Sequence, residues 1–196
     1  MNQKKVLMVH GITDTGKIFQ SMGKVLEKYG YQTHTIDLIP SIGIADLRDL
    51  AQQLKQFINN NFHEQEKINL IGFSMGGLVT RYYLQRLDGI HKVNKYVSIS
   101  APNNGTNNAH LLPLKGIQQM RPNSEFLQDL NSDVKDILSK IETLIMWTPF
   151  DVMILPPKSS IMGVGKEVNF PVLIHRWMLE DERVFNAILN FLGNKS

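Results

Sequence analysis

The sequence contains no cysteine. This absence excludes disulfide bonds, thiol catalysis and zinc–thiolate sites. Neither sign of charge dominates, because the chain has 21 Lys and Arg and 18 Asp and Glu, which gives a net charge of +3. With so small an excess and no basic run, nucleic-acid binding is not expected.

Long apolar runs are missing as well. Lys4-Lys5 is followed by only four apolar residues, Val6 to Val9, whereas a secretory signal needs roughly 7–15. No stretch approaches the ~20 apolar residues of a transmembrane helix. We therefore expect a soluble, cytoplasmic protein without a transmembrane segment, which touches a lipid surface at most transiently. The sequence leaves the oligomeric state open.

Apolar residues make up 42% of the 196 residues and include 9 Phe, 5 Tyr and 2 Trp, enough to form a buried core. The length predicts one domain over residues 1–196. Only the segment 101–133 is irregular, being rich in Asn, Pro and Gly. Because so long a loop within a compact domain is usually functional, we expect it near the active site.

Apolar periodicity predicts alternating strands and helices. Short apolar or alternating runs indicate strands at Lys5–Val9, Gln32–Ile36, Lys67–Phe73, Val93–Ile99, Thr143–Thr148 and Val168–Ile174. Helical spacing indicates helices at Ile18–Tyr29, Leu47–Ile58, Met75–Tyr83 and Asp181–Leu192. Such alternation favours a parallel sheet with helices on both faces. Ligands bind at the carboxyl ends of the strands in such sheets, so chemically capable residues should follow strands.

Gly72-Phe73-Ser74-Met75-Gly76 fits the G-x-S-x-G pattern of a nucleophile elbow, between a predicted strand and a predicted helix. In such an elbow the serine occupies a strained turn, and glycines two residues away remove Cβ atoms that would collide with neighbouring backbone. The turn raises the hydroxyl at a helix N-terminus, which stabilises developing negative charge. Ser74 is therefore the predicted nucleophile; the alternative is a glycine-rich turn that only packs.

A serine hydroxyl requires a base to take its proton. Among the six histidines, His175 follows the last predicted strand and precedes the final helix. His110, in the irregular segment, stays open as an alternative. His10 lies too early in the usual chain order, and we expect it to be structural or to form part of a pocket wall.

The base in turn needs a carboxylate to orient it. Asp151 closely follows the strand predicted at Thr143–Thr148, which gives the chain order Ser, Asp, His. Asp181 and Glu182 are alternatives, although acids are expected at the start of a helix for electrostatic reasons.

The oxyanion of the reaction needs backbone N–H donors. We expect one from Met75, directly after the nucleophile, and the other from Ile12 in the loop His10-Gly11-Ile12, which follows the first strand. Gly11 lets this loop turn sharply.

These motifs resemble the lipase and esterase branch of the α/β-hydrolase superfamily, especially small bacterial triacylglycerol lipases that lack a cap domain. The similarity spans most of the chain. The motifs that carry it are His10-Gly11-Ile12, Ile71–Val79, Ser100–Thr106, parts of 119–131, and Asp151 with His175. One departure is Ile174, where relatives usually have Gly before the catalytic histidine.

The resemblance implies a compact α/β-hydrolase fold with about six mostly parallel strands, helices on both faces and no large cap domain. It also implies that Ser74, Asp151 and His175 form a catalytic triad, with oxyanion donors from Ile12 and Met75.

We therefore predict a serine hydrolase that cleaves carboxylic esters through an acyl-enzyme on Ser74, with no metal or organic cofactor. Alternatives are a thioesterase or acyltransferase on the same triad, and a catalytically silent binding protein. Apolar residues near strand ends predict a wall for the acyl chain, unless they only pack under the loops. The residues considered are His10, Leu111, Leu112, Leu114, Ile154, Leu155, Pro156, Pro157, Trp177 and Met178.

Overall fold

The computed structural model describes residues 4–193 and contains a six-stranded sheet in the order β2-β1-β3-β4-β5-β6. All neighbouring strands run parallel. The strands are β1 (Lys5–Val9), β2 (Gln32–Ile36), β3 (Ile68–Phe73), β4 (Val93–Ile99), β5 (Glu142–Trp147) and β6 (Lys166–Asn169). Strand β2 lies on one side of β1 in the sheet, and β3 to β6 follow one another on the other side. The carboxyl ends of β1 and β3 therefore form a topological switch point, where ligands bind in open α/β sheets.

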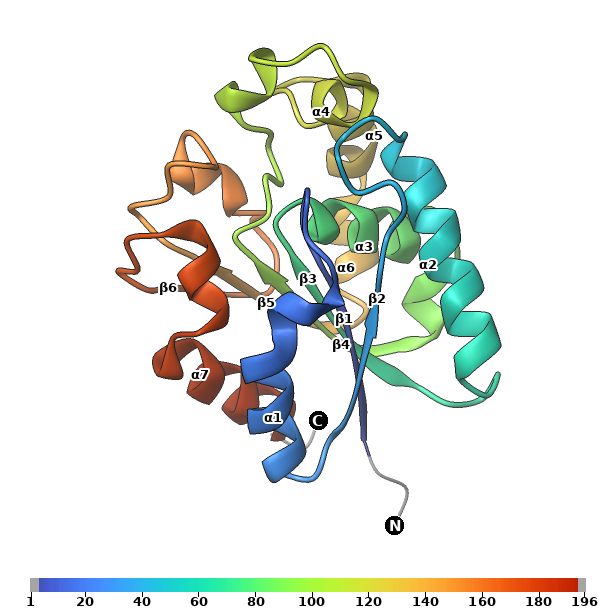
Figure 1. Cartoon of the computed structure of the whole chain (residues 1–196). Coiled ribbons are helices and arrows are strands. Elements are labelled where there is room, and N and C mark those ends of the chain that lie inside the picture. The colour runs from blue at the N-terminus through green and yellow to red at the C-terminus, as the bar shows by residue number, and fades with distance from the viewer. Residues whose placement is uncertain (1–3, 194–196) are drawn as a thin grey trace.

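Helices cover both faces of the sheet (Figure 1). The longer helices are α1 (Gln20–Lys28), α2 (Leu47–Asn61), α3 (Met75–Arg86), α5 (Glu125–Ser132) and α7 (Glu182–Gly193). The shorter helices are the α-helices α4 (Lys115–Gln119) and α6 (Val134–Leu138) and the 3-10 helices η1 (Gly16–Phe19), η2 (Gly89–His91), η3 (Asn107–His110), η4 (Pro157–Ser160) and η5 (His175–Leu179). Helices α1 and α7 pack on one face, whereas α2, α3 and α6 pack on the other.

The alternation of side chains along β1 shows why both faces need cover. Leu7 and Val9 belong to the core under α2 and α3, whereas Val6 and Met8 belong to the core under α1 and α7. All four are at most 1% exposed. A strand that presents apolar side chains on both faces is stable only when both are covered, which is the condition of a parallel sheet.

The predicted architecture is confirmed: within residues 4–193 the sheet is parallel, its helices lie on both faces, and the fold is compact without a large cap domain. Two local predictions differ from the structure. The segment 101–133 is not wholly irregular, because it contains η3, α4 and α5. The strand predicted to reach Ile174 ends at Asn169, close to Pro171, which has no N–H to donate to a ladder.

Within residues 4–193, none of the helices combines the length and apolar character that a membrane crossing requires.

Candidate active site

Ser74 occupies the turn between β3 and α3 in a conformation that non-glycine residues rarely adopt. Its φ is 54° and its ψ is −126°. Its N–H donates to Ile99 O at 2.9 Å, and its carbonyl accepts from Gly77 N at 2.9 Å. Backbone strain of this kind is retained where the surrounding structure enforces it, and it is common at functional sites. The turn thus presents the Ser74 side chain at the carboxyl edge of the sheet.

Gly76 allows the elbow to pack against the end of β1. A Cβ at this position would lie 2.3 Å from Val9 O and 2.4 Å from His10 O. These distances are far below van der Waals contact, and backbone atoms cannot swing aside as the end of a flexible side chain can. The expected steric reason for glycine after the serine therefore holds at this position.

Asp151 and His175 are brought together from two different loops. Asp151 follows β5 and His175 begins η5, and His175 Nδ1 lies 2.7 Å from Asp151 Oδ2. The other carboxylate oxygen, Oδ1, accepts from the backbone N–H groups of Met153 at 2.9 Å and Ile154 at 3.0 Å. Both oxygens of the buried carboxylate are thus occupied, which fixes its orientation. A carboxylate at Nδ1 favours the proton there and leaves Nε2 as an acceptor.

The second ring nitrogen of His175 is free. His175 Nε2 is buried and makes no hydrogen bond within residues 4–193. The ring packs against Phe73, with centroids 4.8 Å apart, and Phe73 directly precedes Ser74. No bond joins Nε2 to Ser74 Oγ here; catalytic hydrogen bonds of this kind often tighten only when substrate binds. The arrangement leaves a proton acceptor next to the elbow.

The loop after β1 passes directly beside Ser74. A Cβ built on Gly11 would lie 2.9 Å from Ser74 Cβ and 3.4 Å from Ser74 Oγ. The hydrogen bonds of the described turns and loops use neither the N–H of Ile12 nor that of Met75. Met75 is the first residue of α3, so its N–H has no acceptor within the helix. Both groups are available to a negatively charged oxygen.

A mostly apolar cavity of about 330 Å³ opens at Ser74. Three of the residues expected in the acyl wall line it, namely Leu111, Leu112 and Ile154. The others that line it are Ile12, Ser74, Pro102, Thr106, Asn108, Ala109, Ile117, Met120 and Met153. Sequence reasoning missed Ile117 and Met120, although their spacing of three residues is a helical signal.

Seven other residues considered for this wall do not line the cavity, namely His10, Leu114, Leu155, Pro156, Pro157, Trp177 and Met178. Met178 is 0% exposed and packs in the core under α1 and α7. His10 is also fully buried; its Nε2 accepts from Leu38 N at 2.9 Å and its Nδ1 donates to Gly11 O at 2.8 Å. Leu155 follows Ile154 but is absent from the lining. Met178 is therefore a core residue and not part of the expected wall, whereas the burial of His10 agrees with the structural role that was one of its two expected roles.

The alternative bases and acids occupy other environments. His110 is exposed at the end of η3. Asp181 binds Arg183, with Oδ2 2.6 Å from Nη2, and its Oδ1 accepts from Arg183 N at the start of α7. Glu182 is exposed. Of the candidates, only Asp151 and His175 form a buried hydrogen-bonded pair.

Arg81 anchors the segment that forms the cavity, and sequence reasoning missed it. Its side chain is fully buried on α3. Nη2 donates to Leu130 O at 2.9 Å and to Asn131 Oδ1 at 2.8 Å, and Nη1 donates to Asn103 O at 3.2 Å. Burial lowers the pKa of Arg81 to about 10, so the guanidinium stays charged at neutral pH. It thus connects α3, which starts directly after Ser74, with both ends of segment 101–133.

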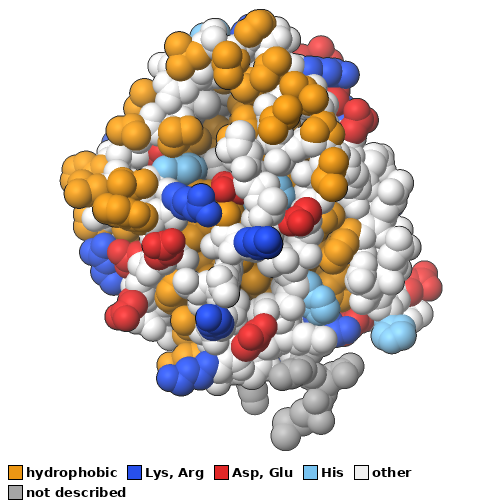
Figure 2. All heavy atoms as spheres, viewed as in Figure 1, with side chains coloured by type: hydrophobic (Ala, Val, Ile, Leu, Met, Phe, Trp, Pro, Cys, Tyr) orange, Lys and Arg blue, Asp and Glu red, His pale blue; other side chains and the backbone are white. Residues whose placement is uncertain are grey.

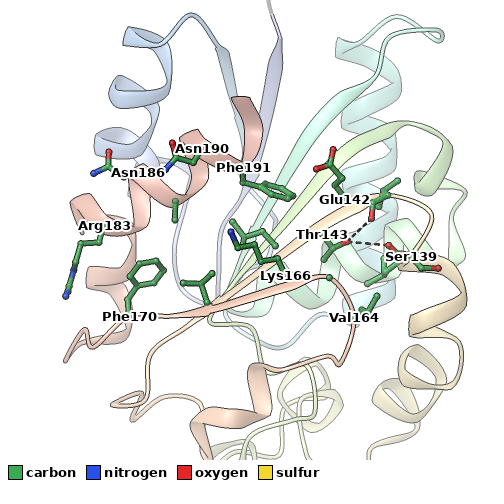
Figure 3. A pocket seen from close by; sticks show the side chains of 16 residues that line it. Ser139, Glu142, Thr143, Val164, Lys166, Phe170, Arg183, Asn186, Asn190 and Phe191 are labelled. Atoms are coloured by element: carbon green, nitrogen blue, oxygen red, sulfur yellow. Dashed lines mark hydrogen bonds between the residues drawn. The ribbon is translucent and has the colours of Figure 1, made fainter. Parts of the chain in front are cut away.

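A second, larger hollow of about 890 Å³ lies between α7 and the edge of the sheet at β5 and β6 (Figure 3). Its described lining includes neither Ser74, Asp151 nor His175. Phe170 and Phe191 contribute apolar surface there, and Lys166 and Arg183 contribute charge. Among the residues described, no group of three His, Asp or Glu is placed to hold a metal ion.

Comparisons with known proteins bear on the family and the fold of this chain. A sequence model of the palmitoyl protein thioesterase family matches residues 5–123, which is more than half of the chain. No curated protein sequence matches the chain significantly.

Solved structures show the same fold at low sequence identity. The mature lipase BlEst2 of Bacillus licheniformis superposes with a TM-score of 0.79 at 14% identity, over 97% of this chain and 92% of that one. Lipase B of Aspergillus fumigatus has a TM-score of 0.80 at 17% identity, over 99% of this chain and 53% of that one. The thioesterase domain from the curacin biosynthetic pathway has a TM-score of 0.70 at 14% identity, over 96% and 91%.

Proposed function

The chain belongs to the palmitoyl protein thioesterase family, within the lipase and esterase branch of the α/β hydrolases, and we propose that it hydrolyses acyl esters or thioesters through an acyl-enzyme on Ser74. The observation that carries this proposal is the buried Asp151–His175 pair, whose ring leaves Nε2 free next to the strained Ser74 turn. A nucleophile, a base and an orienting acid are the three groups that acyl transfer to serine requires.

The reaction has two steps. His175 Nε2 takes the proton of Ser74 Oγ as that oxygen attacks the acyl carbonyl, while the N–H groups of Ile12 and Met75 stabilise the resulting oxyanion. The intermediate collapses with breakage of the bond to the leaving alcohol or thiol, which receives the proton from His175. Water then attacks the acyl-serine by the same route and releases the carboxylic acid. Asp151 stabilises the imidazolium in both steps.

The cavity at Ser74 supports an acyl group of medium length. A cavity of about 150 Å³ in another protein holds benzene, which has six carbons. By this comparison the cavity of about 330 Å³ holds on the order of a dozen carbons. Each methylene that leaves water contributes about 0.8 kcal/mol at most. Octanoyl and decanoyl groups should therefore react faster than acetyl groups, whereas the end of a palmitoyl chain should extend past the cavity and gain little further burial.

Kinetics with matched acyl series test this function. The parent and Ser74→Ala are each assayed with nitrophenyl esters and with the corresponding thioesters, from acetyl to palmitoyl, at equal substrate concentrations. We expect kcat/KM to peak at medium length and to vanish in Ser74→Ala, with Ser139→Ala, an exposed serine remote from the site, as the control. Full turnover in Ser74→Ala would overturn the proposal, and a flat series would overturn the role of the cavity.

The same series discriminates the possible leaving groups. The family match favours thioesters, whereas two of the three structural neighbours compared above are lipases. A higher kcat/KM on thioesters than on matched esters identifies a thioesterase. Formation of a new ester in the presence of a competing alcohol identifies an acyltransferase instead.

A further inference from the structure

The segment that leads to His175 leaves the sheet before it reaches the active site. The last register pair between β5 and β6 joins Trp147 to Asn169. The residues 170–174 that follow form no regular helix or strand, and Pro171 among them has no N–H with which a ladder could continue. His175 then begins η5. The sheet itself therefore does not fix the position of the His175 ring.

The backbone on the two sides of His175 is held differently. After it, Met178 and Leu179 of η5 are fully buried in the core under α1 and α7. Before it, Leu173 and Ile174 are 64% and 46% exposed. Figure 2 shows hydrophobic side chains on the surface at the left of the view, around the loops at the strand ends. Because the residues just before His175 bury little apolar area, the position of their backbone depends mainly on hydrogen bonds.

Thr148, the first residue after β5, makes hydrogen bonds to the backbone of both loops. Its side chain is fully buried, and its Oγ1 donates to Val172 O at 2.5 Å and accepts from Val172 N at 3.3 Å. The same oxygen accepts from Phe150 N at 3.2 Å, directly before Asp151. A hydroxyl has one proton to donate and two lone pairs that accept, so all of its capacity is used. Thr148 thus joins the backbone beside the acid to the backbone that leads to His175.

The hydrogen bond between Asp151 and His175 spans the two loops that Thr148 joins. Its atoms, Nδ1 and Oδ2, lie 2.7 Å apart. The donors to Asp151 Oδ1 are the N–H groups of Met153 and Ile154, which belong to the same loop as the acid and therefore do not relate it to the base. A misplacement of about 1 Å, even when its cause is remote from the chemistry, can reduce a rate about 10²-fold. The spacing of the two loops therefore matters for the reaction.

We propose that Thr148 is a positioning residue for the reaction at Ser74, whose hydroxyl keeps the loops of Asp151 and His175 at the spacing that their hydrogen bond requires. This role rests on the proposed function, because His175 is the base of that reaction. Thr148 does not line the cavity at Ser74. Its loss should therefore slow the chemical step and leave the binding of the acyl group unchanged.

Two substitutions at Thr148 separate the hydroxyl from the shape of the side chain. Thr148→Val keeps the shape and deletes three hydrogen bonds, whereas Thr148→Ser keeps the hydroxyl. On an octanoyl ester, we expect Thr148→Val to lower kcat about 10–100-fold and to change KM less than about twofold. Thr148→Ser should retain most of the parent kcat. A loss in Thr148→Ser as large as that in Thr148→Val would overturn the role of the hydroxyl.

Thr143→Val is the matched control for a purely structural effect. Thr143 is 3% exposed and lies near the opposite end of β5, where its Oγ1 is 3.5 Å from both Leu138 O and Ile141 O. Each variant is labelled to completion with a fluorophosphonate probe, and kcat is expressed per labelled chain, so that unfolded protein does not count. An unchanged kcat in Thr148→Val on this basis, or an equal loss in Thr143→Val, would overturn the proposal.

Proton NMR distinguishes a failure of this proposal from a failure of the proposed function. The proton between His175 Nδ1 and Asp151 Oδ2 should resonate far downfield of the amide protons, and its absence in His175→Ala identifies it. We expect this resonance in the parent and in Thr148→Ser, and its loss through exchange with water in Thr148→Val. If the parent hydrolyses no ester or thioester but this pattern is observed, the proposed function fails and the positioning by Thr148 stands. An identical resonance in Thr148→Val would overturn the positioning whatever the activity.

Discussion

His175 and Asp151 form a buried pair in which Nδ1 lies 2.7 Å from Oδ2, and the opposite ring nitrogen of His175 has no partner within residues 4–193. A buried polar atom without a hydrogen bond costs about 1–3 kcal/mol. The folded protein is therefore more stable when a proton donor forms a hydrogen bond with Nε2. The Ser74 hydroxyl, held at the adjoining elbow, is the donor that our account assigns.

Asp151→Asn should remove most of the activity while preserving the fold. The amide can accept at one atom only, and it no longer stabilises the imidazolium that forms during acyl transfer. We expect kcat on a soluble ester to fall on the order of 10³–10⁴-fold, by analogy with the same change in chymotrypsin-like enzymes. Far-ultraviolet circular dichroism provides the control for folding. A loss below tenfold would remove Asp151 from the triad.

Ala109→Leu should shorten the acyl chain that the enzyme prefers. Ala109 is 2% exposed and lines the cavity at Ser74, so the added atoms occupy space reserved for the acyl chain. We expect the ratio of octanoyl to acetyl turnover to fall about tenfold, because roughly two methylenes lose their burial. Ala187→Leu is the matched control, since Ala187 lines the remote hollow instead. An unchanged ratio in Ala109→Leu, or an equal change in Ala187→Leu, would contradict the assignment.

Arg81→Met should destabilise the protein strongly. The change deletes the charged donors to Leu130 O, Asn131 Oδ1 and Asn103 O, although Leu130 O keeps the donor Gln85 Nε2 and Asn103 O keeps Asn131 Nδ2. Hydrogen bonds to a charged group contribute about 1.5–3 kcal/mol each, so a loss of about 3 kcal/mol or more is expected in urea unfolding. Arg176→Gln, on a side chain that is 58% exposed, should change stability by less than ~0.5 kcal/mol. Similar values for both variants would contradict the anchoring role of Arg81.

Acid should destabilise the fold partly through Asp46. Its burial raises the pKa of the carboxyl, but hydrogen bonds from Gln119, Arg48 N and Lys115, with the charge of Arg48, outweigh burial and lower it below the ordinary value. A lowered folded pKa means that the stabilisation is present above the unfolded value of about 4 and is lost as pH falls through the folded pKa. Asp46→Asn should therefore be less stable at pH 7 and decline less on acidification. Parallel curves of unfolding free energy against pH would exclude this contribution.

The contiguous features of the site could be predicted from sequence because their causes are local. Residues 72–76 lie between an apolar strand and a periodic helix, and the backbone contact at Gly76 has the predicted steric reason. Asp151 and His175 are predictable because they follow strand ends, although His175 lies five residues farther from its strand than expected. Their catalytic roles stay predictions until the experiments are made.

The remaining features depend on contacts between distant segments. Helix α4 has only five residues, too few for a periodic signal, and its position depends on Gly43 O, which accepts from Gly116 N at 3.0 Å and Ile117 N at 3.3 Å. Arginine on a helix is ordinarily expected at the surface. The burial of Arg81 requires carbonyl groups some fifty positions away, as at Leu130. The residues near α4 or near Arg81 in the sequence give no signal of these distant contacts.

The central claim is that Ser74 is an activated nucleophile, and labelling with a fluorophosphonate probe tests it most directly. Intact-mass measurement should show one probe per chain, with the adduct on the peptide that contains Ser74 and none in Ser74→Ala. Labelling should also slow greatly in Asp151→Asn, because the base is then impaired. A parent protein that stays unlabelled, or an adduct on another residue, would contradict the account and favour a hydrolase fold that only binds its ligand.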